Sequence, residues 1–301
     1  MRNFFAVGIL ALILFAGTFE PVVAQELTLY SMPSPREIDW SSPMSLARGS
    51  LLNRLTFHHV KHKHAIGHVF IELRDKNGAV FTGSVPAKEN SSQRWVLKEG
   101  YGLGILFAPI EGALDSSEGL QAELVDRYQS GRIGFIRFLL NQQTYDRLQT
   151  YFKDYQARGF NKIYNGLNRP REGLGAGCSA FGISFLEVAG LMHPVWKKLW
   201  PIEVRIPTKL IGGPITRQKV PLTKVLSVFR WARPDEPHQV LTLYEPYKIW
   251  DWIVKTWNQE KAQPTHKVGL MLRGKAKGLV YDCRHLPCPT EPIFQGAALT
   301  K

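Results

Sequence analysis

The sequence has few of the residues from which metal centres and disulfide-rich scaffolds are built. Only three of its 301 residues are cysteines, and it contains neither a CxxC pair nor an HExxH motif. This excludes zinc-ribbon and zincin motifs and a disulfide-rich mini-protein. Internal repeats and low-complexity tracts are also absent, which excludes a solenoid. A hydrophobic content of 44% with 11% aromatic residues excludes a disordered chain.

Acidic residues are scarce as well. The chain has 25 of them against 38 lysines and arginines, which gives a formal net charge of +13. Such a surplus favours anionic partners, and cell-wall polymers and acidic lipid head groups are the ones that an exported protein meets most often. No motif that combines aromatic and basic residues points to nucleic acid. A role of the charge in solubility alone stays open, and the oligomeric state is not indicated.

Long hydrophobic runs are limited to one. It extends from Phe4 to Phe19, follows Arg2 and leads to the small residues that end at Ala24, as in a secretory signal peptide. We therefore predict a signal peptide at 1–24, and no stable membrane span after cleavage. An uncleaved N-terminal anchor is the alternative. The chain lacks a lipid-anchor cysteine, a sorting motif and wall-binding repeats, so we expect an exported protein, preferably periplasmic, with secretion as the other possibility.

Turn residues and hydrophobic patterning outline the elements that follow. The pattern predicts a helix at 45–55, a hairpin at 67–85, a strand at 133–140 and helices at 142–157 and from 178 to near 190. Residues 104–107 and 225–231 resemble short strands, and the tail from 275 resembles irregular chain. We expect a main domain at 25–200 and an extension of unknown role at 201–301, which is either separate or part of the same domain.

Cys178 is the most informative single residue. It follows a small-residue turn, Gly175-Ala176-Gly177, and opens an apolar helical pattern. At a helix N-terminus, unpaired backbone N–H groups and the helix dipole favour a thiolate. Cys283 and Cys288 are spaced to form a disulfide with each other, which leaves Cys178 as the odd thiol and a candidate nucleophile.

A histidine is the usual base for such a thiol. Five of the nine histidines fall in one stretch, and only His68 lies squarely inside a predicted strand, directly after a glycine, so we take it as the base. A buried structural histidine is the simpler alternative. A zinc or copper site at His62 and His64 is another, but no carboxylate or cysteine in a ligand spacing accompanies them. We expect no metal and no cofactor. The five clustered histidines are His58, His59, His62, His64 and His68.

The order of these motifs adds a resemblance to a known family. A histidine on the first strand of a hairpin (GHVFIEL, 67–73) precedes a strand, a helix, a polar loop and a cysteine that opens a helix (GCSAF, 177–181). This arrangement resembles the circularly permuted branch of the NlpC-type papain-like cysteine hydrolases, to which YiiX-like amidases and lecithin:retinol acyltransferase are similar. The resemblance covers roughly residues 51–190.

The resemblance implies an α+β fold in which helices pack on an antiparallel sheet. It implies Cys178 as nucleophile, His68 as base and the backbone N–H of Cys178 as an oxyanion donor. The family's third polar residue lies on the strand after the histidine strand, and residues 79–85 contain no His, Glu or Gln there. Candidates for the orienting role are Thr82, Ser84 and Glu72, although Glu72 lies some 13 Å along the strand from His68.

Three polar residues in the loop before the nucleophile are candidates to line the substrate cleft, namely Tyr164, Asn165 and Asn168. We therefore expect an exported cysteine amidase or peptidase that acts through a thioester, with cell-wall peptide as a candidate substrate. The alternatives are a catalytically inactive papain-like binding module, a lipid-directed acyl hydrolase or acyltransferase, and a metal-dependent protein.

Overall fold

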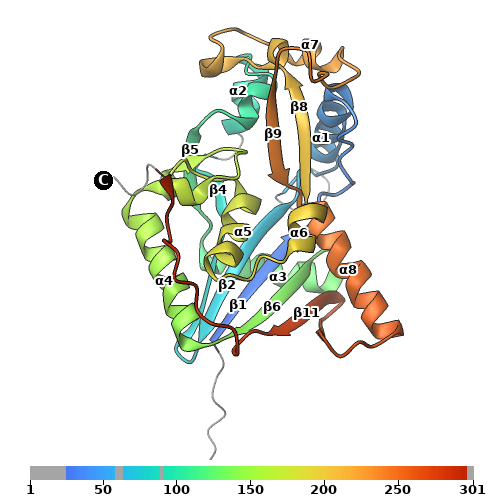
Figure 1. Ribbon diagram of the computed structural model, residues 1–301. Coiled ribbons are helices and arrows are strands. Elements are labelled where there is room, and N and C mark those ends of the chain that lie inside the picture. The colour runs from blue at the N-terminus through green and yellow to red at the C-terminus, as the bar shows by residue number, and fades with distance from the viewer. Residues whose placement is uncertain (1–24, 58–63, 89–90, 297–301) are drawn as a thin grey trace, which may run out of the picture.

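The computed structural model describes residues 25–57, 64–88 and 91–296. The predicted signal peptide at 1–24 lies outside these residues, and so do His58, His59 and His62 of the histidine stretch. The described chain is a mixed α+β structure that is rich in antiparallel strands, as the sequence predicted (Figure 1).

The main sheet has six strands in the order β10-β11-β6-β1-β2-β3. All neighbours are antiparallel except β11 and β6, which are parallel. Two of the strands come from the last 35 residues of the chain, so the C-terminal segment completes the sheet that the N-terminal segment begins. The strands are β1 (Gln25–Met32), β2 (His68–Asp75), β3 (Gly78–Thr82), β6 (Gly134–Leu140), β10 (Gly269–Arg273) and β11 (Ala276–Asp282).

Smaller sheets flank the main one. A three-stranded sheet in the order β4-β5-β7 begins with β4, which comes directly after β3 in the chain. The antiparallel pair β8-β9 extends past one end of the main sheet beside α1 (Figure 1). These strands are β4 (Ser84–Pro86), β5 (Ile110–Leu114), β7 (Ile163–Tyr164), β8 (Pro201–Pro207) and β9 (His238–Tyr244).

Helices cover both faces of the main sheet. The helices α4, α5 and α8 share one hydrophobic cluster with Leu29 and Ile71, while α3 packs with Tyr30 and Phe70 on the other face. A third hydrophobic cluster joins α1 and α7 to the antiparallel strand pair β8-β9. The helices are α1 (Pro43–Phe57), α2 (Ser91–Leu97), α3 (Ser117–Ser130), α4 (Gln142–Ala157), α5 (Cys178–Val188), α6 (Pro194–Leu199), α7 (Leu222–Leu226) and α8 (Pro246–Ala262).

Local signals explain the two helices that matter most for the site. Asn141 caps α4, because its side-chain oxygen accepts the N–H of Thr144 at 2.9 Å. Helix α5 approaches the sheet closely at Gly182, where a Cβ atom would lie 2.7 Å from Val69 Cγ1. The absence of a side chain at this position lets α5 pack directly on β2, and this contact sets where Cys178 lies.

Several predictions of local structure are wrong. Residues 104–107 lie mostly in a short 3-10 helix, Leu103–Leu106, because Gly104 packs against the backbone of Gly212. The strand predicted from Val225 begins inside α7, where Val225 is buried in the cluster with α1. The tail predicted to be irregular from 275 begins with β11 (Ala276–Asp282), and only residues 283–296 of its described part are irregular. Short apolar runs do not distinguish helix from strand, and this explains the first two errors.

The predicted disulfide is also wrong, since Cys283 and Cys288 are both free thiols in the structure. Cys283 packs in the main hydrophobic cluster, and burial raises the pKa of its thiol to about 11. The Cys288 thiol instead lies 3.7 Å from the carbonyl oxygen of Pro289 and points to a different neighbour. The spacing of two cysteines in sequence does not fix the direction of their side chains, so it does not determine pairing.

Candidate active site

Cys178 is the first residue of α5. The N-cap position is Gly177, whose extended backbone brings no side chain to cap the helix. The first N–H groups of α5 therefore remain available beside the thiol, as in sites that stabilise a thiolate. The Val69 N–H also hydrogen-bonds to the sulfur. Cys178 is buried, with only 9% of the residue exposed.

His68 is the first residue of β2, at the edge of the main sheet. Strand β3 ends at Thr82, so His68 lies beyond the last residue pair of β2 and β3. Gly83 follows, and a Cβ there would lie 2.9 Å from His68 Nε2. The missing side chain at Gly83 leaves the space that the imidazole occupies. His68 itself is 2% exposed.

Asp115 supplies the carboxylate that faces this imidazole. Its Oδ2 lies 2.9 Å from His68 Nε2, and its own N–H donates to the Gly83 carbonyl at 2.8 Å. Asp115 directly follows β5 and precedes Ser116, which caps α3. Asp115 was not among the predicted site residues, because neither β5 nor α3 was predicted from the sequence. The available signal was the run Asp115-Ser116-Ser117-Glu118, which is typical of a helix start.

The side chains of His68 and Cys178 hydrogen-bond to each other, and each shifts the pKa of the other. Burial disfavours a charged imidazole, yet the hydrogen bonds from Asp115 and Cys178 outweigh it and raise the pKa of His68 to about 10. Burial opposes a thiolate as well, and the hydrogen bond and charge of His68 outweigh this and lower the pKa of Cys178. The two shifts favour an imidazolium and thiolate pair over a neutral imidazole and thiol.

Tyr164 also contacts the thiol of Cys178. Burial, followed by the charge of Cys178, raises the pKa of Tyr164 well above its usual range, so the phenol stays protonated. Its hydroxyl accepts the backbone N–H of Cys178 and also hydrogen-bonds to the sulfur. The structure thus brings one of the three predicted cleft residues to the nucleophile.

The other two loop residues differ from Tyr164. Asn165 is buried and holds the loop together, since its side chain donates to the Leu174 carbonyl at 2.6 Å and accepts the Leu167 N–H at 3.0 Å. Asn168 is partly exposed in the same loop, and no hydrogen bond joins it to Cys178 within the described chain. Asn165 therefore has a structural role beside the site.

The three residues predicted to orient His68 do not hydrogen-bond to it in the described part of the chain. Ser84 donates to the Ala176 carbonyl at 2.9 Å and so fixes the turn before Cys178. Thr82 is buried, and its hydroxyl has no hydrogen-bond partner among the described residues. Glu72 accepts the Tyr30 hydroxyl at 2.6 Å and pairs with Arg74 at the far end of β2. Asp115 holds the orienting position instead.

A second histidine and carboxylate pair lies beside the first. His64 stacks on His68 with ring centroids 4.1 Å apart, and its Nε2 lies 3.2 Å from Glu123 Oε2. Glu123 in turn accepts from Arg127 at 2.8 Å. Burial and the charge of His68 together lower the pKa of His64 to about 4, against the raising effect of Glu123. At a pH between these two pKa values, His64 is thus neutral and His68 is charged.

Possible metal ligands do not gather in the described residues. There is no group of three or more His, Cys, Asp or Glu side chains with the geometry to hold a metal ion within residues 25–57, 64–88 and 91–296. His62, which belonged to the alternative metal site, lies outside this range. His64, the other member, faces Glu123.

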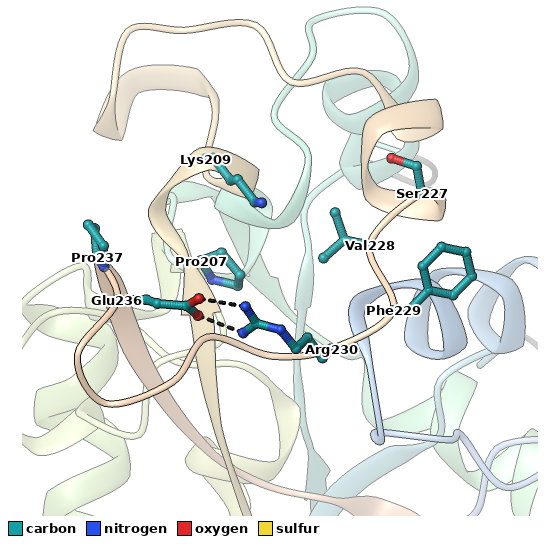
Figure 2. Close-up of a pocket in the computed structure, with 8 residues that line it drawn as sticks. All are labelled: Pro207, Lys209, Ser227, Val228, Phe229, Arg230, Glu236 and Pro237. Carbon is teal, nitrogen blue, oxygen red and sulfur yellow. Dashed lines mark hydrogen bonds and ion pairs between the residues drawn. The ribbon is translucent and has the colours of Figure 1, made fainter.

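Two hollows of the described surface are not lined by Cys178. One hollow of about 560 Å³ is formed where the loop after α7 passes β8, around the Arg230 and Glu236 ion pair, with Lys209 on its wall (Figure 2). The two ion-pair hydrogen bonds measure 2.5 and 2.6 Å. Neither Cys178 nor His68 lines this hollow.

Comparisons with known proteins give no match. No protein-family model, no curated protein and no solved structure matches this chain. Among the described residues, no helix combines the length and apolar character needed to cross a membrane.

Proposed function

We propose that this chain is a cysteine hydrolase that cleaves an amide through a thioester intermediate, with Cys178 as nucleophile, His68 as acid and base, and Asp115 as the residue that orients His68. The observation that carries the proposal is that one imidazole hydrogen-bonds to the thiol and to a carboxylate at the same time. Nucleophile, base and orienting group in hydrogen-bond contact form the arrangement that acyl transfer requires.

The reaction has two steps. The Cys178 thiolate attacks the carbonyl carbon and forms a C–S bond, and the carbonyl oxygen becomes an oxyanion. His68 then gives its proton to the amine nitrogen as the C–N bond breaks and the amine leaves. In the second step His68 takes a proton from water, and the resulting hydroxide attacks the thioester. The C–S bond then breaks, the acid product leaves, and the ion pair of Cys178 and His68 is restored.

The oxyanion has two donors within reach. The backbone N–H of Cys178 is at the start of α5, and the Tyr164 hydroxyl lies beside it. In the free protein these two groups hydrogen-bond to each other. A carbonyl oxygen that enters between them accepts from both, because Tyr164 keeps its proton. Tyr164 therefore acts as a donor to the transition state in this proposal.

The same proposal extends to family and location. The order of the histidine strand and the cysteine helix supports membership of the circularly permuted NlpC-type papain-like hydrolases. The predicted signal peptide and the surplus of 13 positive charges support an exported protein that acts on anionic cell-wall material. Cell-wall peptide is the proposed substrate, and a lipid acyl group is the alternative.

Thiol labelling tests the chemistry directly, and the chain supplies its own comparison. Iodoacetamide is a small reagent, which suits a residue that is only 9% exposed. At pH 7 we expect Cys178 to be carboxamidomethylated faster than the more exposed Cys288, as measured by peptide mass spectrometry. Cys283 should react slowest, because its pKa is raised. Labelling of Cys178 that is slower than that of Cys288 would contradict an activated thiol.

Hydrolysis tests the function itself. We expect the protein to release amine from cell-wall peptide fragments, and the Cys178→Ser variant to lose this activity while it keeps its fold. The near burial of Cys178 favours one other candidate, a binding module that retains the fold without chemistry. Rapid labelling of Cys178 combined with no release of amine or acid from peptide or lipid substrates would favour that module.

A further inference from the structure

A second hollow, of about 480 Å³, lies where β9 ends and α8 begins. It is separate from the one in Figure 2 and is lined in part by three carboxylates and an indole. Its charge is negative in a protein whose net charge is +13. The lining residues that matter here are Glu37, Asp39, Trp40, Glu245 and Lys248.

Glu245 is the unusual member of this group. The residue is only 3% exposed, and its Oε2 accepts the Lys248 N–H at 2.8 Å as the cap of α8. Its other oxygen, Oε1, is buried and has no hydrogen-bond partner among the described residues. A buried carboxylate oxygen without a partner costs about 1 to 3 kcal/mol or more, so it indicates a missing partner.

The neighbours of Glu245 do not supply that partner. The Lys248 ammonium donates to the Pro201 carbonyl at 3.2 Å instead of neutralising Oε1. Glu37 lies near enough for its negative charge to act on Glu245. Burial first, and Glu37 in addition, raise the pKa of Glu245 to about 7 against the lowering effect of Lys248 and of two backbone N–H groups. Lys248 thus acts on the carboxylate through its charge, but its ammonium makes no hydrogen bond to Oε1.

The walls of the hollow indicate which cation fits. Trp40 and Ile202 provide an indole and an aliphatic surface, while Glu37 and Asp39 add negative charge at the exposed rim. No group of three metal-binding side chains forms in the described chain, which disfavours a metal ion. A primary ammonium on an aliphatic stem matches the combination, because carboxylates pair with its charge and the indole packs on its stem.

From these contacts we propose that the hollow at the start of α8 binds a primary ammonium group, with Glu245 Oε1 as its buried acceptor. The proposal is independent of the chemistry at Cys178. Pro246, which follows Glu245, lies close to the histidine strand, because a Cβ at Gly67, the residue before His68, would be 2.8 Å from Pro246 Cβ. The Ser31 hydroxyl also donates to the Pro246 carbonyl at 2.7 Å, which fixes α8 to the end of β1.

Calorimetric titration of the full chain at pH 8, where Glu245 is mostly ionised, tests this. The probes are N-acetyl-lysine amide, which has a side-chain ammonium, alanine amide, which has an α-ammonium, and the neutral N-acetyl-norleucine amide. We expect saturable binding of at least one ammonium probe and at least about 10-fold weaker binding of the neutral probe. Whichever ammonium probe binds more tightly identifies the source of the group.

Two variants complete the test. Glu245→Gln retains an oxygen to cap α8 but loses the charge, and it should weaken ammonium binding by about 10-fold or more. Glu203→Gln makes the same change of charge at an exposed position of β8 and should leave binding unchanged. Equal binding of the neutral probe, unchanged binding in Glu245→Gln, or no binding of either ammonium probe overturns the proposal. If Glu245→Gln does not fold, the comparison of the three probes on the unmodified protein decides.

Discussion

Two histidine and carboxylate pairs lie ring against ring at the edge of the main sheet, and they titrate in opposite directions. The pKa of His68, which faces Asp115, is raised to about 10, whereas the pKa of His64, which faces Glu123, is lowered to about 4. His68 is buried and His64 is partly buried, and both have a carboxylate within hydrogen-bond distance. A carboxylate partner alone therefore does not decide the charge of a histidine here.

The difference comes from the third group in each cluster. His68 also hydrogen-bonds to Cys178, whose thiolate stabilises the imidazolium. Glu123 also pairs with Arg127, which weakens its effect on His64. The stacked imidazolium of His68 in addition repels a positive charge on His64. The thiol thus selects which of two adjacent imidazoles is charged, and four substitutions test this comparison.

Among the four substitutions, the one at His68 is expected to reduce hydrolysis most. His68→Gln removes the group that holds the Cys178 thiolate, so hydrolysis should fall by about 10,000-fold and labelling of Cys178 at pH 7 by about 100-fold. Labelling rates against pH will show the reason, because the pKa of Cys178 should rise once its imidazolium partner is lost. An unchanged pH profile would mean that His68 does not activate the thiol.

Asp115→Asn should have the next largest effect. The amide keeps the size of the side chain but loses the negative charge that favours the imidazolium, so hydrolysis should fall by about 100-fold. The pKa of His68 should move down from about 10 towards its ordinary value, which NMR titration of the ring measures. Glu123→Gln is the control on the second pair, and an equal loss of activity in both variants would contradict the distinction between them.

A smaller effect is expected at Gly83. Gly83→Ala places a Cβ 2.9 Å from His68 Nε2 and 3.0 Å from Asp115 Oδ2, so the two side chains must move apart. We expect hydrolysis to fall by about 10-fold, with little change in KM. Gly49→Ala is the matched control, because the nearest atom to its Cβ lies at 3.8 Å. Full activity in Gly83→Ala would show that the contact of His68 and Asp115 is dispensable.

The smallest effect on activity is expected at His64, where stability is the informative readout. As the pH falls from 6.5 to about 4, His64 takes up a proton in the unfolded chain but not in the folded one, so the protein loses stability. His64→Phe keeps a ring on His68 and removes this loss of up to about 3 kcal/mol.

Urea unfolding at pH 7 and pH 4.5 measures this difference. We expect the two proteins to diverge at the lower pH, with His64→Phe losing less stability, and hydrolysis at pH 7 to change by no more than about threefold. Replacement of the exposed His285 by Phe is the control. Equal acid sensitivity in His64→Phe and in the unmodified protein would contradict a neutral, partly buried His64.

Much of the fold near the site could be predicted from local signals. The helix at 142–157 was predicted to the residue, because Asn141 caps it and its apolar residues recur at helical spacing. The helix that begins at Cys178 was also predicted correctly. The hairpin at 67–85 was predicted in part, since β3 ends at Thr82 and Ser84 and Val85 belong to β4 in another sheet. The segments 104–107 and 225–231 were wrong, since their conformation depends on distant packing partners.

The sequence by itself determined where Cys178 and His68 lie within their elements, because a small-residue turn before an apolar helix and a glycine before a strand are local features. Only the tertiary structure decided their surroundings. Asp115 reaches His68 because β3 ends and Gly83 leaves room, and Cys283 turns into the core and away from Cys288. Contacts between segments distant in sequence depend on the register of strands and the close approach of helices, and no local pattern encodes these.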